Sequence, residues 1–208
     1  MRDVLICDFG GVLTTPLQEG FLAYQDEAGV SLEELGMAMA RAAEEHGDHP
    51  LFVLERGEIT EAEFWSRISR HAGGEFDLDR LRALFFKHLE PNVPMIDFVR
   101  ELRGRGVRAA LLTNNVREWE PLWRGKLPEV DELFEVIVDS AFVGLRKPDP
   151  AIYELTLERL GGVAAERCVF VDDLDVNCDT ARDLGMEAVR FESAGQAIPA
   201  IERAFFRN

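Results

Sequence analysis

The chain has 208 residues, and its 23 lysines and arginines against 39 aspartates and glutamates give it a formal net charge of −16. A negative charge of this size repels nucleic acids and anionic membrane surfaces, so we expect neither as a partner. With 47% hydrophobic residues the chain can bury a sizeable core, and its length fits one domain or a domain with an insertion.

The cysteines and the N-terminal segment indicate the compartment. Cys7, Cys168 and Cys178 are odd in number and form no CxxC pair, which argues against a disulfide framework. Few apolar residues precede Asp8, too few for a signal peptide, and no apolar run reaches the roughly 18 residues of a membrane span. We therefore expect a soluble, cytoplasmic protein.

Five short apolar runs predict buried strands, at residues 4–7, 107–112, 136–138, 168–171 and 188–191. A parallel sheet that is covered on both faces contains such runs because neither side of its strands meets water. Helical patterns lie between the later runs, at residues 94–102, 150–160 and 175–184. This alternation predicts an α/β fold with a doubly wound (Rossmann-like) parallel sheet.

The stretch between the first and second predicted strands differs, because it holds helical patterns and no convincing strand. The patterns cover residues 17–28, 31–45, 60–71 and 78–89. Ser31 with Glu34, and Thr60 with Glu63, match the capping box that opens helices. We expect an α-helical cap over residues 15–89, inserted into a catalytic core that consists of residues 1–14 and 90–208.

Polar side chains follow four of the predicted strands, at the point where each one ends. They are Asp8 after the first strand, Thr113 and Asn114 after the second, Lys147 in the loop after the third, and Asp172 and Asp173 after the fourth. The carboxyl ends of parallel strands meet at one edge of a sheet, where such folds bind ligands. We therefore expect these side chains to share one crevice.

This set of residues suits phosphoryl transfer. Three carboxylates in one crevice repel one another unless a hard cation lies among them, and oxygen ligands suit Mg²⁺. The carboxylate of Asp8 could attack phosphorus, which gives an aspartyl-phosphate and splits hydrolysis into two easier steps. Lys147, the Thr113 hydroxyl and the backbone N–H of Asn114 could bind the phosphoryl oxygens.

The same residues resemble the ordered motifs of the haloacid dehalogenase superfamily of hydrolases. The matching segments are Asp8-Phe9-Gly10-Gly11-Val12-Leu13, Leu112-Thr113-Asn114, Arg146-Lys147-Pro148-Asp149-Pro150 and Phe170-Val171-Asp172-Asp173. The resemblance extends to about residue 191 and favours the branch with the N-terminal phosphatase domain of soluble epoxide hydrolases and bacterial sugar-phosphate phosphatases. The run Glu55-Arg56-Gly57-Glu58 in the cap also resembles that branch.

The resemblance implies a metal site and a nucleophile. Asp8 would be the nucleophile and a metal ligand, and Asp173 would be a second carboxylate ligand. Gly10 would give its backbone carbonyl to Mg²⁺. Asp172 would support the metal through water or by holding its ligands in place.

The resemblance also implies a phosphate site and a substrate. Thr113 and Asn114 would bind the phosphoryl group, while Lys147 would bridge the nucleophile and the phosphate. The implied reaction is Mg²⁺-dependent hydrolysis of a small phosphorylated metabolite. Whether the protein is a monomer or a homodimer stays open.

Gly10 departs from the pattern of this superfamily. Most of its phosphatases carry Asp at this position as general acid and base, a role worth roughly 10²–10⁴-fold in rate. Turnover could therefore be slow, require good leaving groups, or use a cap residue or water for proton transfer. The alternative is a non-catalytic or weakly active module that binds a phosphorylated ligand.

Two further functions fit the sequence less well. A haloacid dehalogenase also lacks Asp at the position of Gly10, but such enzymes work without the metal to which Asp172 and Asp173 point. A phospho-receiver domain uses similar residues with the acidic pair first and the Lys last, whereas here the pair comes last. The order of the residues therefore argues against a receiver domain.

Several aromatic residues fall on apolar faces of the predicted helices. We interpret Trp65, Phe85 and Phe86 as the packed core of the cap rather than as part of a ligand site. Trp119 and Trp123 lie four residues apart on one helical face, which favours packing or, if they are exposed, a dimer contact.

Overall fold

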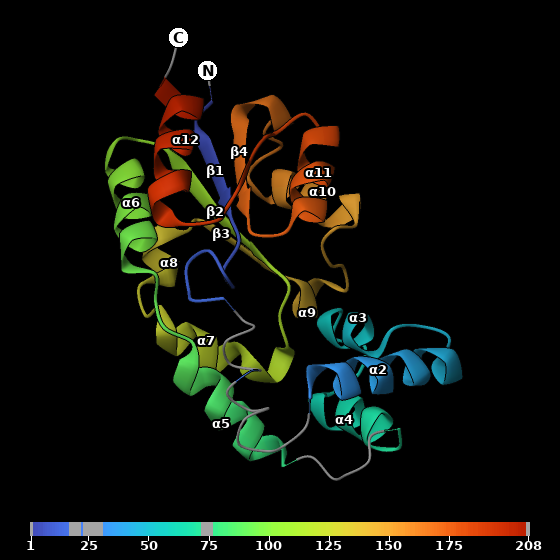
Figure 1. Ribbon diagram of the computed structural model, residues 1–208. Helices are drawn as coiled ribbons and strands as arrows, with labels where there is room; N and C mark the ends of the chain where they lie inside the picture. Colours follow the sequence, from blue (N-terminus) through green and yellow to red (C-terminus); the bar gives the residue numbers. More distant parts are fainter. Residues whose placement is uncertain (1, 17–21, 23–30, 72–76, 207–208) are drawn as a thin grey trace.

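The computed structural model describes residues 2–16, 22, 31–71 and 77–206 and contains a parallel sheet of five strands (Figure 1). The strands are β1 (Val4–Cys7), β2 (Arg108–Thr113), β3 (Val136–Asp139), β4 (Cys168–Asp172) and β5 (Glu187–Arg190), and they lie in the order β3-β2-β1-β4-β5. Each predicted strand is found within one residue of its expected ends. The predicted doubly wound α/β fold is therefore confirmed.

Helices cover both faces of this sheet. One face carries α6 (Val93–Gly104), α8 (Val130–Leu133) and α12 (Ala194–Phe206), and the other carries α10 (Pro150–Arg159) and α11 (Asp175–Asp183) (Figure 1). Successive residues of a strand point to opposite faces, so each strand supplies both cores. In β1, Leu5 and Cys7 pack in the α6–α12 core, whereas Val4 and Ile6 pack in the α10–α11 core.

Local signals explain where the predicted helices begin. α10 starts with Pro150 in its first turn, and the side chain of Asp149 accepts a hydrogen bond from the N–H of Ala151 at 2.9 Å. We did not predict α12 from the sequence. That helix contains Pro199, which a sequence pattern treats as a helix breaker.

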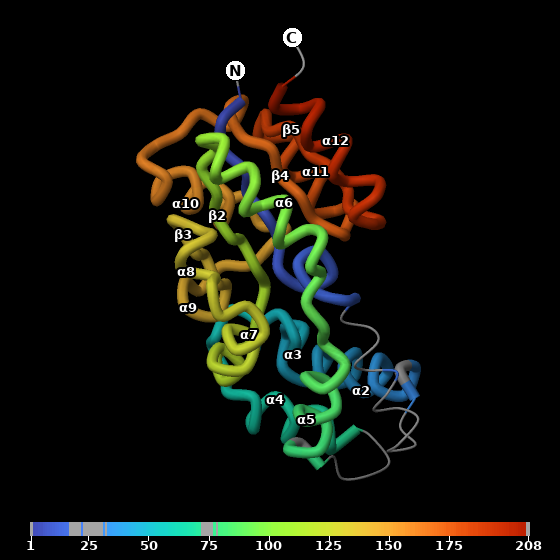
Figure 2. Tube along the Cα trace, turned by 90° about the vertical axis from the view of Figure 1, so that its left-hand side faces the viewer, coloured from blue at the N-terminus to red at the C-terminus, as the bar shows by residue number. Residues whose placement is uncertain are grey.

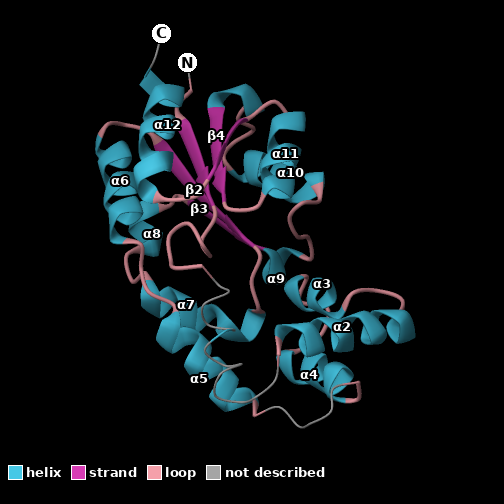
Figure 3. Cartoon of the chain, viewed as in Figure 1, coloured by secondary structure: helices cyan, strands magenta, loops and turns pink. Residues whose placement is uncertain are grey.

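A block of helices lies at the carboxyl edge of the sheet, on the opposite side from both termini (Figures 2 and 3). It contains α2 (Leu32–His46), α3 (Pro50–Glu55), α4 (Glu61–Ser69) and α5 (Leu78–His88). Ser31 and Glu34 form the predicted capping box, while Thr60 caps α4 through the N–H of Glu63 at 3.2 Å. The short helix α3 was not predicted, and the helix expected over residues 17–28 lies outside the described residues except for residue 22.

The chain leaves and re-enters the core at neighbouring points. Thr14 and Pro91 form an isolated antiparallel bridge, and the N–H of Thr15 donates to the carbonyl of Glu90 at 2.8 Å. The N–H of Asn92 donates to the carbonyl of Leu13, also at 2.8 Å. The helical block is thus joined to the core by two segments that lie side by side.

The remaining helices are short and lie in the segments that connect the strands to the longer helices. They are η1 (Arg117–Trp119) and α7 (Glu120–Lys126) after β2, α9 (Ser140–Val143) after β3, and η2 (Ala165–Arg167) before β4. Across the described ranges of the chain, every helix is too short or too polar to traverse a lipid bilayer.

The end of β3 holds a buried carboxyl group whose charge disfavours the fold. Asp139 accepts the N–H of Ala141 at 3.0 Å through Oδ1, while Oδ2 is buried without a hydrogen-bond partner among the described residues. Burial raises the pKa of Asp139 to about 7. The pKa of such a carboxyl group is about 3.9 in the unfolded chain. The protein therefore loses stability as the pH rises from there through 7.

We expect Asp139→Asn to stabilise the protein at high pH. Asn keeps the oxygen that caps α9 and cannot ionise, so the advantage of the variant should grow by about 1–3 kcal/mol between pH 5 and pH 8.5. Thermal melting of both proteins, followed by circular dichroism at the two pH values, measures this difference. An equal difference in Tm at both values would contradict the assigned cause.

Candidate active site

The centre of the site is a buried lysine between two carboxylates. Lys147 is 1% exposed, and its Nζ lies 2.8 Å from Oδ1 of Asp8 and 2.6 Å from Oδ2 of Asp172. Asp8 follows β1 and Asp172 ends β4, and these two strands are neighbours in the sheet. The adjacency of β1 and β4 therefore brings together residues that stand far apart in the sequence.

Asp172 is held from several directions. Its Oδ1 accepts hydrogen bonds at 2.9 Å from the N–H of Leu174 and from Nδ2 of Asn177, which is buried in α11. Its Oδ2 is taken by Lys147. With both oxygens engaged, Asp172 is better suited to fix Lys147 than to bind a metal directly.

The acidic residues fit a hard cation. Asp8, Asp172 and Asp173 each offer a carboxylate oxygen, and the three oxygens lie within 4.8 Å of one another. An all-oxygen donor set with this spacing suits Mg²⁺. Gly11, with φ of 77°, makes room for one of these donors, because a Cβ there would stand 2.4 Å from Oδ2 of Asp173.

The charges at this site perturb one another. Burial raises the pKa of Asp8 to about 7, against the opposing effect of Lys147. Burial also raises the pKa of Asp173. For Lys147, burial alone would lower the pKa, but the adjacent Asp172 and Asp8 carboxylates outweigh it and raise the pKa above its usual range. Lys147 is therefore a permanent cation beside Asp8.

Thr113 and Asn114 lie next to this cluster at the end of β2. The side chain of Asn114 donates from Nδ2 to the carbonyl of Lys147 at 3.0 Å, and its Oδ1 accepts the N–H of Lys147 at 2.8 Å. These bonds engage the amide oxygen and one of the two amide N–H groups, so the Asn114 side chain is held against the Lys147 loop. Thr113 is 2% exposed, and its hydroxyl makes one long bond, at 3.4 Å, to the carbonyl of Asn114.

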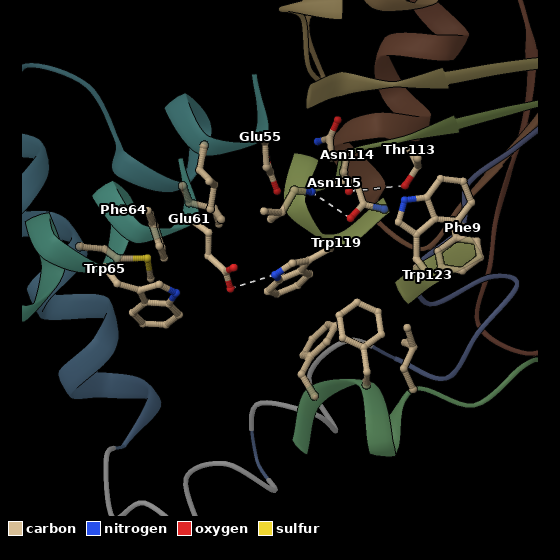
Figure 4. A pocket seen from close by; sticks show the side chains of 18 of the residues that line it. Phe9, Glu55, Glu61, Phe64, Trp65, Thr113, Asn114, Asn115, Trp119 and Trp123 are labelled. Atoms are coloured by element: carbon tan, nitrogen blue, oxygen red, sulfur yellow. Dashed lines mark hydrogen bonds between the residues drawn. The ribbon is translucent and has the colours of Figure 1, made fainter. Parts of the chain in front are cut away.

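A cavity of about 310 Å³ opens between this edge of the sheet and the helical block. Phe9, Gly10, Thr113 and Asn114 line it beside Asp8, and Figure 4 shows Thr113 and Asn114 at the opposite end from Phe64 and Trp65. Thr113 and Asn114, at the end of β2, therefore face the space between the sheet and the helical block.

The cavity corrects our interpretation of the aromatic residues. Trp65, Phe85, Phe86, Trp119 and Trp123 all line it, although each also packs in a hydrophobic cluster. Phe85 and Phe86 belong to the cluster that packs on the sheet rather than to that of the helical block. Trp123 is only 1% exposed, which also excludes it as a dimer contact.

Two ties between the helical block and the core were missed in the sequence. Glu55 of α3 accepts from Nε of Arg146 at 2.7 Å, and both side chains are largely buried. Glu61 of α4 accepts from Nε1 of Trp119 at 2.9 Å. Neither pairing could be predicted from the sequence, because opposite charges alone do not select a partner 58 or 91 positions away.

Comparison with known proteins identifies the family. A sequence profile described as haloacid dehalogenase-like hydrolase matches residues 3–185. The chain belongs to the haloacid dehalogenase-like hydrolases. The resemblance noted in the sequence is thereby confirmed, and this hydrolase can be compared with individual relatives.

Two curated proteins illustrate the relationship. A sesquiterpene phosphatase of Aspergillus oryzae is 31% identical over 193 residues, which cover 87% of the hydrolase and 85% of the relative. The rat bifunctional epoxide hydrolase 2 is 24% identical over 210 residues, covering 94% of the hydrolase but 37% of the relative. The hydrolase spans between 10% and 37% of the length of its mammalian relatives.

A solved structure shares both fold and sequence with the hydrolase. It is a family enzyme of Bacteroides thetaiotaomicron in complex with magnesium and inorganic phosphate, with a TM-score of 0.70 and 25% identity. The match covers 94% of the hydrolase and 96% of that chain. The likeness therefore includes the sheet and the helical block together.

Proposed function

We propose that this hydrolase is a Mg²⁺-dependent phosphatase that forms an aspartyl-phosphate on Asp8. The observation that carries the proposal is the buried Lys147, which contacts Asp8 at 2.8 Å inside a cluster of three carboxylates. A phosphatase among the relatives and a Bacteroides structure with magnesium and phosphate support the same reaction class.

The chain's own residues supply the nucleophile and its orientation. Oδ1 of Asp8 is fixed by Lys147 and by the N–H of Phe9 at 2.7 Å, so the carboxylate is held in one position. Its attack on phosphorus breaks the bond from phosphorus to the ester oxygen, and that oxygen leaves with a proton. Water then hydrolyses the aspartyl-phosphate, which releases inorganic phosphate and restores the carboxylate.

The metal would be held by the carboxylates of Asp8 and Asp173 and the backbone carbonyl of Gly10, with Asp172 acting on them through Lys147. When bound, Mg²⁺ would offset the charge of the acidic cluster and of the transferring phosphoryl group. Lys147, the Thr113 hydroxyl and the backbone N–H of Asn114 would bind the phosphoryl oxygens.

Gly10 has no side chain that could protonate the leaving group, so the proton must come from another side chain or from water. Glu55 lines the same cavity as Gly10, and burial raises the pKa of its carboxyl group. The ion pair with Arg146 opposes this rise, and the carboxyl group is the one acidic group of α3 that faces the site. We therefore favour Glu55 as the proton donor. It belongs to the helical segment of residues 15–89, which we propose acts as a cap.

Phosphate release with and without metal tests the proposal. We expect native protein with Mg²⁺ to release phosphate from p-nitrophenyl phosphate and from members of a phosphometabolite panel. EDTA should lower the rate at least about 10²-fold, and excess Mg²⁺ should restore it. Equal rates in EDTA would remove the metal from the mechanism. No release from any compound, with Mg²⁺ still binding in calorimetry, would favour the non-catalytic alternative.

A further inference from the structure

The walls of the cavity beside the proposed nucleophile are apolar over most of their extent. The aromatic rings of Phe85 and Phe86 lie 4.8 and 5.4 Å from that of Trp119, measured between centroids. Leu35 and Met39 of α2 line the cavity from the cap, with Phe64 and Trp65 of α4 beyond them. A ligand here meets hydrocarbon and ring faces on the sides of the cap and of the sheet.

Two of the polar side chains that line the cavity, Glu61 and Asn114, are already bound within the protein. Glu61 is 3% exposed, and its Oε1 accepts from Trp119 while its Oε2 accepts from Nη2 of Arg82 at 2.6 Å. Both polar atoms of the Asn114 side chain are bound to the backbone of Lys147. A ligand rich in hydroxyl groups would lose its bonds to water here and regain few of them, which is costly.

The cavity is continuous with the site of chemistry. Phe9, Gly10 and Thr113 line it at the end where the phosphoryl group would sit, and Phe64 and Trp65 line the far end (Figure 4). The cavity has a volume of about 310 Å³. A water molecule or a methylene group takes up roughly 30 Å³, so the cavity holds about ten such groups. The space beyond the phosphate therefore fits one medium-length hydrocarbon group.

We infer that the substrate is a phosphate monoester of an apolar alcohol with roughly eight to ten carbon atoms, its hydrocarbon part enclosed between α2, α4, α5 and the loop after β2. This inference rests on the proposed phosphatase function and names the substrate class for the same site. Burial of each further methylene should raise kcat/KM by about fourfold, the factor that corresponds to the free energy of transferring a methylene from water.

A homologous series of alkyl phosphates tests the inference. Phosphate release is measured with Mg²⁺ for ethyl, butyl, hexyl, octyl and decyl phosphate below their micelle concentrations, with a hexose phosphate as the polar compound of similar size. We expect kcat/KM to rise with chain length and level off near eight to ten carbons, with the hexose phosphate at least about tenfold below octyl phosphate. Release that does not depend on chain length would overturn the inference and leave the phosphatase proposal intact.

A matched pair of variants assigns the preference to the cavity. Met39→Gln keeps the length of the side chain and places an amide in the cavity wall, whereas Met37→Gln makes the same change at a residue of α2 that is 47% exposed and does not line the cavity. We expect Met39→Gln to lower the ratio of kcat/KM for octyl over ethyl phosphate about tenfold, and Met37→Gln to leave the ratio unchanged. Equal effects of the two variants would place the hydrocarbon elsewhere.

Ligand binding separates this inference from the proposed function. The chain has three tryptophans, and all three line the cavity, so their fluorescence reports its occupation. Titration of native protein and Mg²⁺ with ethyl, butyl, hexyl and octyl phosphonate, which cannot be hydrolysed, should show Kd falling about fourfold per methylene. Such a fall without any turnover would retain the ligand class and reject the phosphatase. A Kd independent of chain length would reject the ligand class, whatever the turnover.

Discussion

Asp8→Asn should abolish phosphate release, lowering kcat by a factor on the order of 10⁴ or more. The amide of Asn is a poor nucleophile and cannot form the acyl phosphate on which the proposed two-step route depends. It keeps the shape of the carboxylate, so the buried surroundings of residue 8, which is 8% exposed, need not rearrange. Release of phosphate from p-nitrophenyl phosphate with Mg²⁺ measures the effect.

The control for this prediction is Asp179→Asn. Asp179 is an exposed residue of α11 that pairs with Arg182 of the same helix, and we expect its replacement to leave kcat unchanged. Circular dichroism of both variants checks that the fold is retained. If folded Asp8→Asn kept more than about a tenth of the native rate, the nucleophile would have to be another group.

Lys147→Met should impair both stability and catalysis. Met has a similar length and no charge, so two buried carboxylates lose the cation that lies between them. Removing one partner of a buried ion pair costs about 3–5 kcal/mol, because the remaining charge is left uncompensated. In EDTA we expect Tm to fall on the order of 10 °C. With Mg²⁺, kcat should fall about 10²–10³-fold or more through loss of a donor to the phosphoryl group.

A second substitution tests the cause of that loss. In the double variant Lys147→Met with Asp8→Asn, one of the two uncompensated charges is gone, so part of the lost Tm should return. Lys87→Met makes the same change at an exposed residue of α5 and should leave Tm within about 1–2 °C of native. If Lys147→Met and Lys87→Met had the same Tm in EDTA, the buried cation would have no stabilising role.

The strands, and the convergence of polar residues at their ends, could be predicted from the sequence. Strands buried on both faces are continuous apolar runs, and the residue that ends such a run is marked by its change of polarity, as at Asp8 and Asp172. The parallel arrangement then places these ends at one edge. The contact of Lys147 with both carboxylates agrees with this reasoning, although its loop has no regular pattern of its own.

The cavity could not be predicted, because it depends on how separate elements face each other. Trp65 and Phe86 satisfy a helical apolar pattern whether they fill a core or line a hollow in it, so the pattern alone does not distinguish the two. The ties from Glu61 to Trp119 and from Glu55 to Arg146 join residues that are 58 and 91 positions apart. Charge and size give no signal for such pairings in a single sequence.

The placement of the chain ends has a practical consequence for handling the protein. β1 begins and α12 ends at the edge of the sheet that faces away from the cavity (Figure 1). An affinity tag, a fluorescent fusion or a surface linker attached at either end would therefore extend away from the mouth of the site. Immobilised protein should keep its substrates' route of access, which makes sensor-chip and bead formats suitable for screening ligands.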